Sequence, residues 1–268
     1  MNSVNTRRTF RLGLAIVTCC ALSYASLGVA QTALEGKNLS ALARENLDKK
    51  RPKPPFDLTG TYNFDWKVNG GPFTAYKFLP VPQLLPSAQK EFDTHEADQK
   101  KGLEYKDDPA ACWPLGMPRM MTRYWPIQII QLPTEVVLIT MFDHSVRWIY
   151  TDGRPHPSDN DLVYTYNGHS IGHWEGNALI VDTVGLTDDH HWLQEGVPVG
   201  TNLHVVERIT KIADGFQDEF TITDPDNWVG ELKSTKRYTR DDKADIEEHV
   251  CIYEEVSQLP GFKFNVRE

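Results

Sequence analysis

From Glu135 onward, apolar and polar residues alternate in short runs separated by turn residues, which is the pattern of antiparallel β-strands. Asp214-Gly215 is the strongest of the turn signals, because Asp-Gly favours the tight turn of a β-hairpin. One earlier strand is expected at 58–64. The later strands are expected at 136–141, 146–151, 170–174, 178–184, 203–212, 216–224, 233–238 and 249–254.

Eight or nine such strands with few helices predict a mainly β fold. An antiparallel, calycin-like (lipocalin-type) barrel with an internal cavity and one or two peripheral helices is the first expectation, because closure removes exposed sheet edges. A β-sandwich is the alternative. One helix is expected from Ser87, as its N-cap, to about Lys101, and the segment 109–131 is expected to be irregular.

The N-terminus carries the pattern of an export signal. Three arginines (Arg7, Arg8 and Arg11) precede an uncharged apolar run, and Gly28-Val29-Ala30 supplies the small residues that a signal peptidase reads. We therefore expect residues 1–30 to be a signal peptide, with a resemblance to the twin-arginine type, and a periplasmic or secreted protein. Residues 31–56 are expected to form a short helix and a Pro-rich linker, and 57–268 a single domain.

Charge and cysteine content narrow the partners and the compartment. Removing residues 1–30 takes away three arginines and no acid, so the formal net charge falls from −9 to −12. Such acidity argues against nucleic acid and anionic membranes as partners. The remaining cysteines, Cys112 and Cys251, are expected to pair in a disulfide worth about 4–5 kcal/mol in the chain-entropy model, with a reactive thiol as the alternative.

The segment 168–184 concentrates the candidate chemistry. With Gly176-Asn177 as its loop, this hairpin places His169, His173 and Asp182 on one face with two isoleucines. A carboxylate beside an imidazole suits general acid–base catalysis, which predicts a catalytic pair of His169 and Asp182. The alternative is a polar pair on the barrel exterior, because the opposite face is equally apolar.

A second ionisable group is expected inside the barrel. In the hairpin around Asp214-Gly215, Ile209 is expected opposite Phe220, and Glu207 shares the apolar face. A buried carboxylate needs a partner or has a raised pKa. Glu207 is therefore either a third catalytic group or the counter-ion of Arg147 or Arg154.

Other residues are candidates for holding a substrate. Arg154 and Tyr150 could stabilise an oxyanion, and aromatic rings could line the apolar part of a pocket. The residues expected to contact substrate are Arg147, Tyr150, Arg154, His156, His173, Trp174, His190 and Trp192.

No cofactor is expected. The sequence has no nucleotide-binding glycine loop, no dinucleotide fingerprint and no haem attachment motif, which argues against those chemistries. A mononuclear metal site built from His169, His190 and Asp182 is the alternative.

Several motifs together resemble an uncharacterised family of exported bacterial proteins. They are Cys112-x-Pro114-x-Gly116-x-Pro118-Arg119, Arg147-x-Ile149-Tyr150-x-Asp152-Gly153-Arg154-x-His156-Pro157, Gly168-His169-Ser170-Ile171-Gly172-x-Trp174-Glu175-Gly176, Asp182-Thr183, Glu207-Arg208, Asp224-Pro225 and Cys251. The resemblance covers about residues 57–255 and supports the barrel fold without implying a reaction. His173 and Asn177 depart from the pattern, which commonly has Arg and Asp there.

These observations predict a periplasmic, cofactor-independent acid–base enzyme acting on a small apolar or aromatic molecule. A lyase, dehydratase, isomerase or cyclase step would use His169, Asp182 and Glu207 in an apolar pocket. The alternatives are a non-catalytic barrel that binds a small hydrophobic ligand and a metal-dependent hydrolase or oxygenase.

Overall fold

The computed structural model describes residues 39–72, 74–101, 109 and 112–252. The chain divides into two compact units, 1–40 and 41–268, and nearly all described residues belong to the second. The expected signal peptide, residues 1–30, lies outside the described residues.

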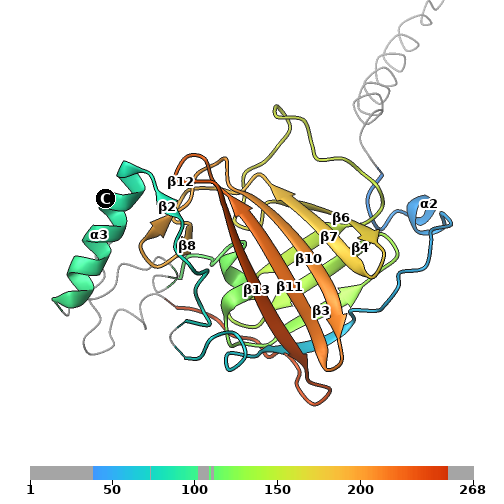
Figure 1. Ribbon diagram of the computed structural model, residues 1–268. Helices are drawn as coiled ribbons and strands as arrows, with labels where there is room; N and C mark the ends of the chain where they lie inside the picture. The colour runs from blue at the N-terminus through green and yellow to red at the C-terminus, as the bar shows by residue number, and fades with distance from the viewer. Residues whose placement is uncertain (1–38, 73, 102–108, 110–111, 253–268) are drawn as a thin grey trace, which may run out of the picture. The chain divides into compact units, whose positions relative to one another are not determined.

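Nine of the described strands close into a barrel in the order β1-β13-β11-β10-β7-β6-β5-β4-β3. This confirms the expected barrel and excludes the sandwich. Figure 1 shows the three long strands β10, β11 and β13 side by side, in orange to dark red. The barrel strands are β1 (Gly60–Phe64), β3 (Ile127–Gln131), β4 (Glu135–Thr140), β5 (Val146–Tyr150), β6 (His169–Glu175), β7 (Ala178–Val184), β10 (His204–Ile212), β11 (Gly215–Thr223) and β13 (Glu231–Arg240).

One barrel pairing is parallel, unlike the fully antiparallel barrel that the sequence suggests. Ile149 of β5 pairs with Ser170 of β6 in the parallel sense. A parallel pair needs a crossover connection, and residues 151–168 provide it. The crossover ends at Gly168, whose φ is +63° and where a Cβ would lie 2.5 Å from the carbonyl oxygen of Val184. Glycine is required there by both the backbone angle and the close approach.

Two other expectations about strands are wrong. β3 lies within the segment expected to be irregular, although Ile127 and Ile129 show the alternation of a strand and are buried. Residues 249–252, part of an expected last strand, form no strand.

The two long hairpins differ in how well their register matches the sequence. β6 and β7 pair as expected, with Ile171 opposite Asp182. β10 and β11 pair two residues out of the expected register, so that Glu207 lies opposite Phe220 and Ile209 opposite Asp218. The reason is the turn: Gly215 already pairs with Ile212, so the loop is one residue earlier than Asp214-Gly215. A shift of two keeps every side chain on its expected face.

The smaller elements surround the barrel. β2 pairs with β12 and β8 with β9 in two-stranded sheets. The longer helix begins at Pro86 after Leu85, so Ser87 lies inside it and is not its N-cap. Within the described residues, no helix is long and apolar enough to cross a membrane. These elements are α2 (Arg44–Leu47), α3 (Pro86–Lys100), the 3-10 helix η2 (Arg119–Thr122), β2 (Gln83–Leu84), β8 (Trp192–Gln194), β9 (Val197–Pro198) and β12 (Trp228–Val229).

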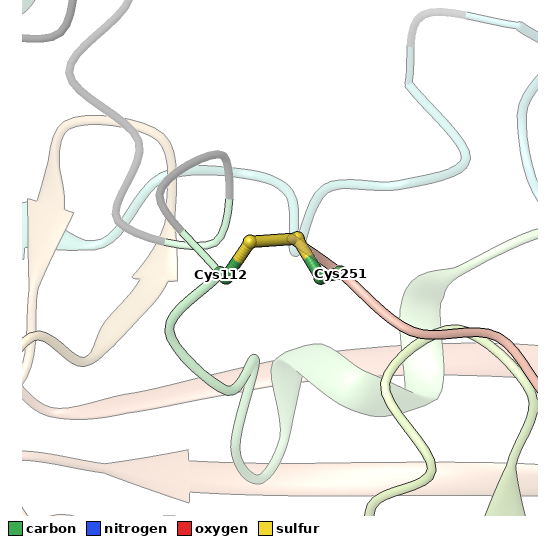
Figure 2. Close-up of a disulfide and its surroundings, with 2 residues drawn as sticks. All are labelled: Cys112 and Cys251. Atoms are coloured by element: carbon green, nitrogen blue, oxygen red, sulfur yellow. A yellow bond between two sulfur atoms is a disulfide. The ribbon is translucent and has the colours of Figure 1, made fainter. Parts of the chain in front are cut away.

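A disulfide joins Cys112 to Cys251, as the sequence predicts (Figure 2). The two Cα atoms are 5.6 Å apart across 139 positions of sequence. The bond ties the segment that follows β13 to the segment that precedes η2.

Candidate functional site

The strands that carry the candidate residues present two chemically different faces. On β6 and β7, Ser170 and Thr183 are fully buried and face the barrel interior, whereas His169 and Asp182 lie on the outer face and are half-buried. The expectation that His169 and Asp182 meet in an internal pocket is therefore wrong. Alternate residues of a strand share a face, so Thr183 points the same way as Leu179 and Val181. Because Leu179 and Val181 are fully buried core residues, this face is the interior one.

Four side chains meet on this outer face, and we call them the histidine cluster: His156, His169, Asp182 and His204. The Nδ1 atoms of His156 and His169 are 2.8 Å apart. Nε2 of His156 lies 3.1 Å, and Nε2 of His204 3.0 Å, from the Oδ1 atom of Asp182. The sequence predicts a pair of Asp182 and His169, but the hydrogen-bond partners of Asp182 are His156 from the crossover and His204 from β10.

The environments of the cluster move the pKa values of its members in different directions. Hydrogen bonding from His204 lowers the pKa of Asp182, and the same bond raises the pKa of His204. Burial, followed by the charges of His156 and Arg154, lowers the pKa of His169 to about 4. One histidine is thus kept neutral while another is made more basic, which is how acid and base roles are separated within one site.

The ionised Asp182 carboxylate restricts which ring nitrogens carry protons. Asp182 is ionised and can only accept, so Nε2 of His156 donates to it. With a neutral ring, His156 then accepts at Nδ1, and His169 donates its Nδ1 proton to it. The lone pair of His169 is consequently at Nε2, so Asp182, His156 and His169 form a series that ends in a basic nitrogen.

Arg154 and Tyr150, two of the residues predicted to contact substrate, border the cluster. The ring of Tyr150 lies 5.4 Å from that of His169, and the Arg154 guanidinium lies 4.1 Å from the Tyr150 ring centre. Asp152 holds Arg154 through a 2.6 Å ion pair and accepts a 2.8 Å hydrogen bond from Asn46. Burial raises the pKa of Asp152, but these hydrogen bonds outweigh it and bring the pKa to about 2. Arg154 is therefore held by Asp152.

Four expected substrate-binding residues lie away from the cluster. His173 is exposed on the outer face and pairs with Glu175, and Trp174 packs edge-on against Phe56. His190 stacks on Trp113 at 4.0 Å, and Trp192 is buried in β8. The expected metal site of His169, His190 and Asp182 is not assembled, and the described residues contain no group of three donors arranged to hold a metal ion.

Arg147 and Glu207 form an ion pair inside the barrel, fully shielded from solvent. Glu207 is the counter-ion of Arg147, one of the two roles that the sequence allows. Arg147 also donates to Ser170 at 3.2 Å and to Thr183 at 3.0 Å, and these two hydroxyls bond to each other. All of these groups are hydrogen-bonded within the protein, so Arg147 and Glu207 belong to a structural network and lie apart from the histidine cluster.

Asp218, on β11, is a neighbour of this network that the sequence did not single out. It is fully buried, and neither carboxyl oxygen has a hydrogen-bond partner among the described residues. Burial, and then the neighbouring Glu207 carboxylate, raise the pKa of Asp218 well above its usual range. A protonated Asp218 donating to Glu207 would satisfy both groups and leave the network with Arg147 electrically neutral.

Sequence reasoning missed His204 and assigned His156 only to substrate contact. His204 lies at the start of β10, and this position predicts a contact with Asp182 only if β10 is known to pair with β7. No protein-family model and no curated protein matches this chain, so the function must be argued from the site itself.

Proposed function

We propose that this protein is a cofactor-independent acid–base enzyme that acts on a small apolar or aromatic molecule at the outer wall of its barrel. The observation that carries the proposal is the hydrogen-bonded series Asp182–His156–His169, with His204 on the other side of the same carboxylate. His169 acts as the base and His204 as the acid.

The series compensates for the weakness of His169 as an isolated base. Protonating His169 directly would place a cation in a half-buried position next to Arg154, which is why its pKa is low. If His169 accepts a substrate proton at Nε2 while its Nδ1 proton passes to His156, the positive charge moves next to the Asp182 carboxylate. That charge is then stabilised by an ion pair, so the proton transfer costs less.

The spacing of the acid and the base suits a reaction that removes a proton at one atom and supplies one at another. His169 pairs with Val184, and the adjacent Thr183 pairs with Val205, so His204 lies on the far side of Val184. Two strand spacings separate the two histidine backbones by roughly 10 Å. A substrate of one or two rings lying over Val184 would reach both groups, which suits a lyase, dehydratase, isomerase or cyclase step.

The side chains around the cluster support an apolar or aromatic substrate. Tyr150 contacts His169, and Trp148, two positions earlier on the outer face of β5, is 49% exposed. Ile171 and Val184 lie beside the cluster on the same face. The disulfide agrees with an oxidising compartment, and we propose export through residues 1–30 to the periplasm or beyond.

The proposal can be tested without knowing the natural substrate. Removal of the carbon-bound proton of 5-nitrobenzisoxazole by a base opens its ring to a coloured phenolate. The protein should accelerate this reaction above buffer, and His169→Asn should reduce the rate by about 10²-fold or more. His173→Asn, on the same strand and face but outside the cluster, is the matched control and should leave the rate unchanged. Equal losses in both variants, or no acceleration by the unmodified protein, would contradict the proposal.

A further inference from the structure

A polar cleft of about 640 Å³ lies between the segment 69–79 and the strands β11 and β13. Its lining is rich in amines and hydroxyls: the described lining residues include three lysines and one carboxylate. The residues used below are Thr74, Lys77, Glu219, Lys233, Ser234 and Lys236.

Lys236 is the unusual member of this lining, because it is only 3% exposed. Its Nζ atom donates to the carbonyl oxygens of Ala75 at 2.8 Å and Lys77 at 2.7 Å, so the amine lies against the wall that 74–77 form. A neutral amine has two N–H bonds and one lone pair. The two carbonyls satisfy both N–H bonds, and the lone pair is left for another partner.

The surroundings of Lys236 increase the share of this neutral form, and the cation, which lies 5.3 Å from the centre of the Phe78 ring, remains the major form at neutral pH. Burial lowers its pKa from 10.5 to about 8. Asp218 lies opposite Lys236 in the β11–β13 register, Glu219 and Lys233 line the cleft, and Lys77 pairs with Glu195 at 3.5 Å. At neutral pH the fraction of free amine is roughly two orders of magnitude larger than for an ordinary lysine.

We infer that Lys236 is a nucleophilic amine that binds small anionic aldehydes or ketones in this cleft as an imine. The nitrogen attacks the carbonyl carbon, the carbonyl oxygen leaves as water with the two amine protons, and a carbon–nitrogen double bond remains. Lys77 and Lys233 provide positive charge for a carboxylate on the ligand, and the hydroxyls of Thr74 and Ser234 provide hydrogen bonds. This site is independent of the histidine cluster.

Glyoxylate, an aldehyde that carries a carboxylate, tests the inference when cyanoborohydride is present to reduce the imine. Peptide mapping by mass spectrometry should find one carboxymethyl group on Lys236 at limiting reagent, before the exposed Lys233 is labelled. The rate of labelling should rise with pH with a midpoint near 8, the pKa of Lys236. Lys236→Arg, which keeps the cation and its donors, should abolish this labelling, whereas Lys211→Arg, at an exposed lysine outside the cleft, should keep it.

Three outcomes would overturn the inference. They are labelling of lysines in proportion to their exposure, a pH midpoint near that of ordinary lysines, and unchanged labelling in Lys236→Arg. The first two are measured on the unmodified protein, so a variant that fails to fold does not decide the question. A lysine that serves only to anchor the segment 74–77 would give these outcomes.

Discussion

Strands β6, β7 and β10 each contribute to two ionic clusters that differ in almost every physical respect. On the inner face, Arg147 and Glu207 are completely buried, and their charges are paired within the protein. On the outer face, the side chains of Asp182 and His204 are each 40% exposed and still exchange with solvent. Ser170 and His169, and likewise Thr183 and Asp182, are consecutive residues that serve opposite clusters.

The comparison shows how burial changes what similar residue types can do. The inner network holds strands together, because every charge there must be compensated permanently and proton exchange with solvent is slow. The outer cluster has histidines with opposite pKa shifts and is partly exposed to solvent, and proton transfer requires both. Judged by residue type alone, both the inner Glu207 and the outer His169 and Asp182 are candidates for catalysis.

The largest effect is expected from breaking the inner ion pair. Arg147→Leu leaves the Glu207 carboxylate buried without a cation, so the free energy of unfolding should fall by about 3–5 kcal/mol. Urea denaturation measures this change. Arg208→Leu is the matched control, because Arg208 is next to Glu207 in sequence but is half-exposed, and its ion pair with Glu175 is long, at 3.8 Å. This variant should change the free energy of unfolding by less than about 0.5 kcal/mol. Similar losses in the two variants would contradict the contrast between the faces.

The next effect concerns Asp218 and is seen as a dependence on pH. Because its folded pKa lies above 3.8, the folded protein holds a proton that the unfolded chain has lost. The protonated Asp218 therefore contributes its full stability below about pH 3.8, the pKa in the unfolded chain. The contribution declines by about 1.4 kcal/mol per pH unit as the pH rises toward the folded pKa. Asp218→Asn, whose amide can donate to Glu207 without a titrating proton, should remove this slope.

Urea denaturation of both proteins at several pH values between about 5 and about 8 measures that slope. The variant should gain stability relative to the unmodified protein as the pH rises. Glu231→Gln, at an exposed position of β13, is the control and should give a parallel curve. If the curves of Asp218→Asn and the unmodified protein are also parallel, Asp218 and Glu207 do not share a proton.

The sequence anticipated much of the fold but left the sidedness of the site open. Taking Gly176-Asn177 as the loop gave the correct register of β6 and β7, and the barrel and the disulfide are confirmed. Which face of that hairpin points inward could not be decided, because Trp174, Leu179 and Val181 on one face are as apolar as the isoleucines on the other. That choice depends on which strands flank the hairpin, and this is long-range information.

The members of the histidine cluster were predictable to different degrees. His169 and Asp182 follow from hairpin spacing, whereas His156 arrives through an irregular crossover whose path no periodicity encodes. His204 depends on the pairing of β10 with β7. For Glu207, alternation gave the interior position, and only the folded barrel distinguishes Arg147 from Arg154 as its partner.

The smallest effect on stability, with a clear effect on titration, is expected from the outer cluster. Asp182→Asn replaces the charged acceptor that raises the pKa of His204 with a neutral amide, so that pKa should fall toward the ordinary 6.5. The rate with 5-nitrobenzisoxazole should fall by about tenfold or more, while the free energy of unfolding changes by no more than about 1 kcal/mol. A large loss of stability with unchanged titration of His204 would assign Asp182 to structure instead.

The central claim is that the outer histidines are set apart by their environments as base and acid, and nuclear magnetic resonance of the imidazole nitrogens tests it most directly. In the unmodified protein, His169 should stay neutral, with its proton on Nδ1, until the pH falls to about 4, and His204 should hold its second proton above pH 6.5. Two histidines that both titrate near 6.5, with no preference of His169 for the Nδ1 proton, would contradict the account.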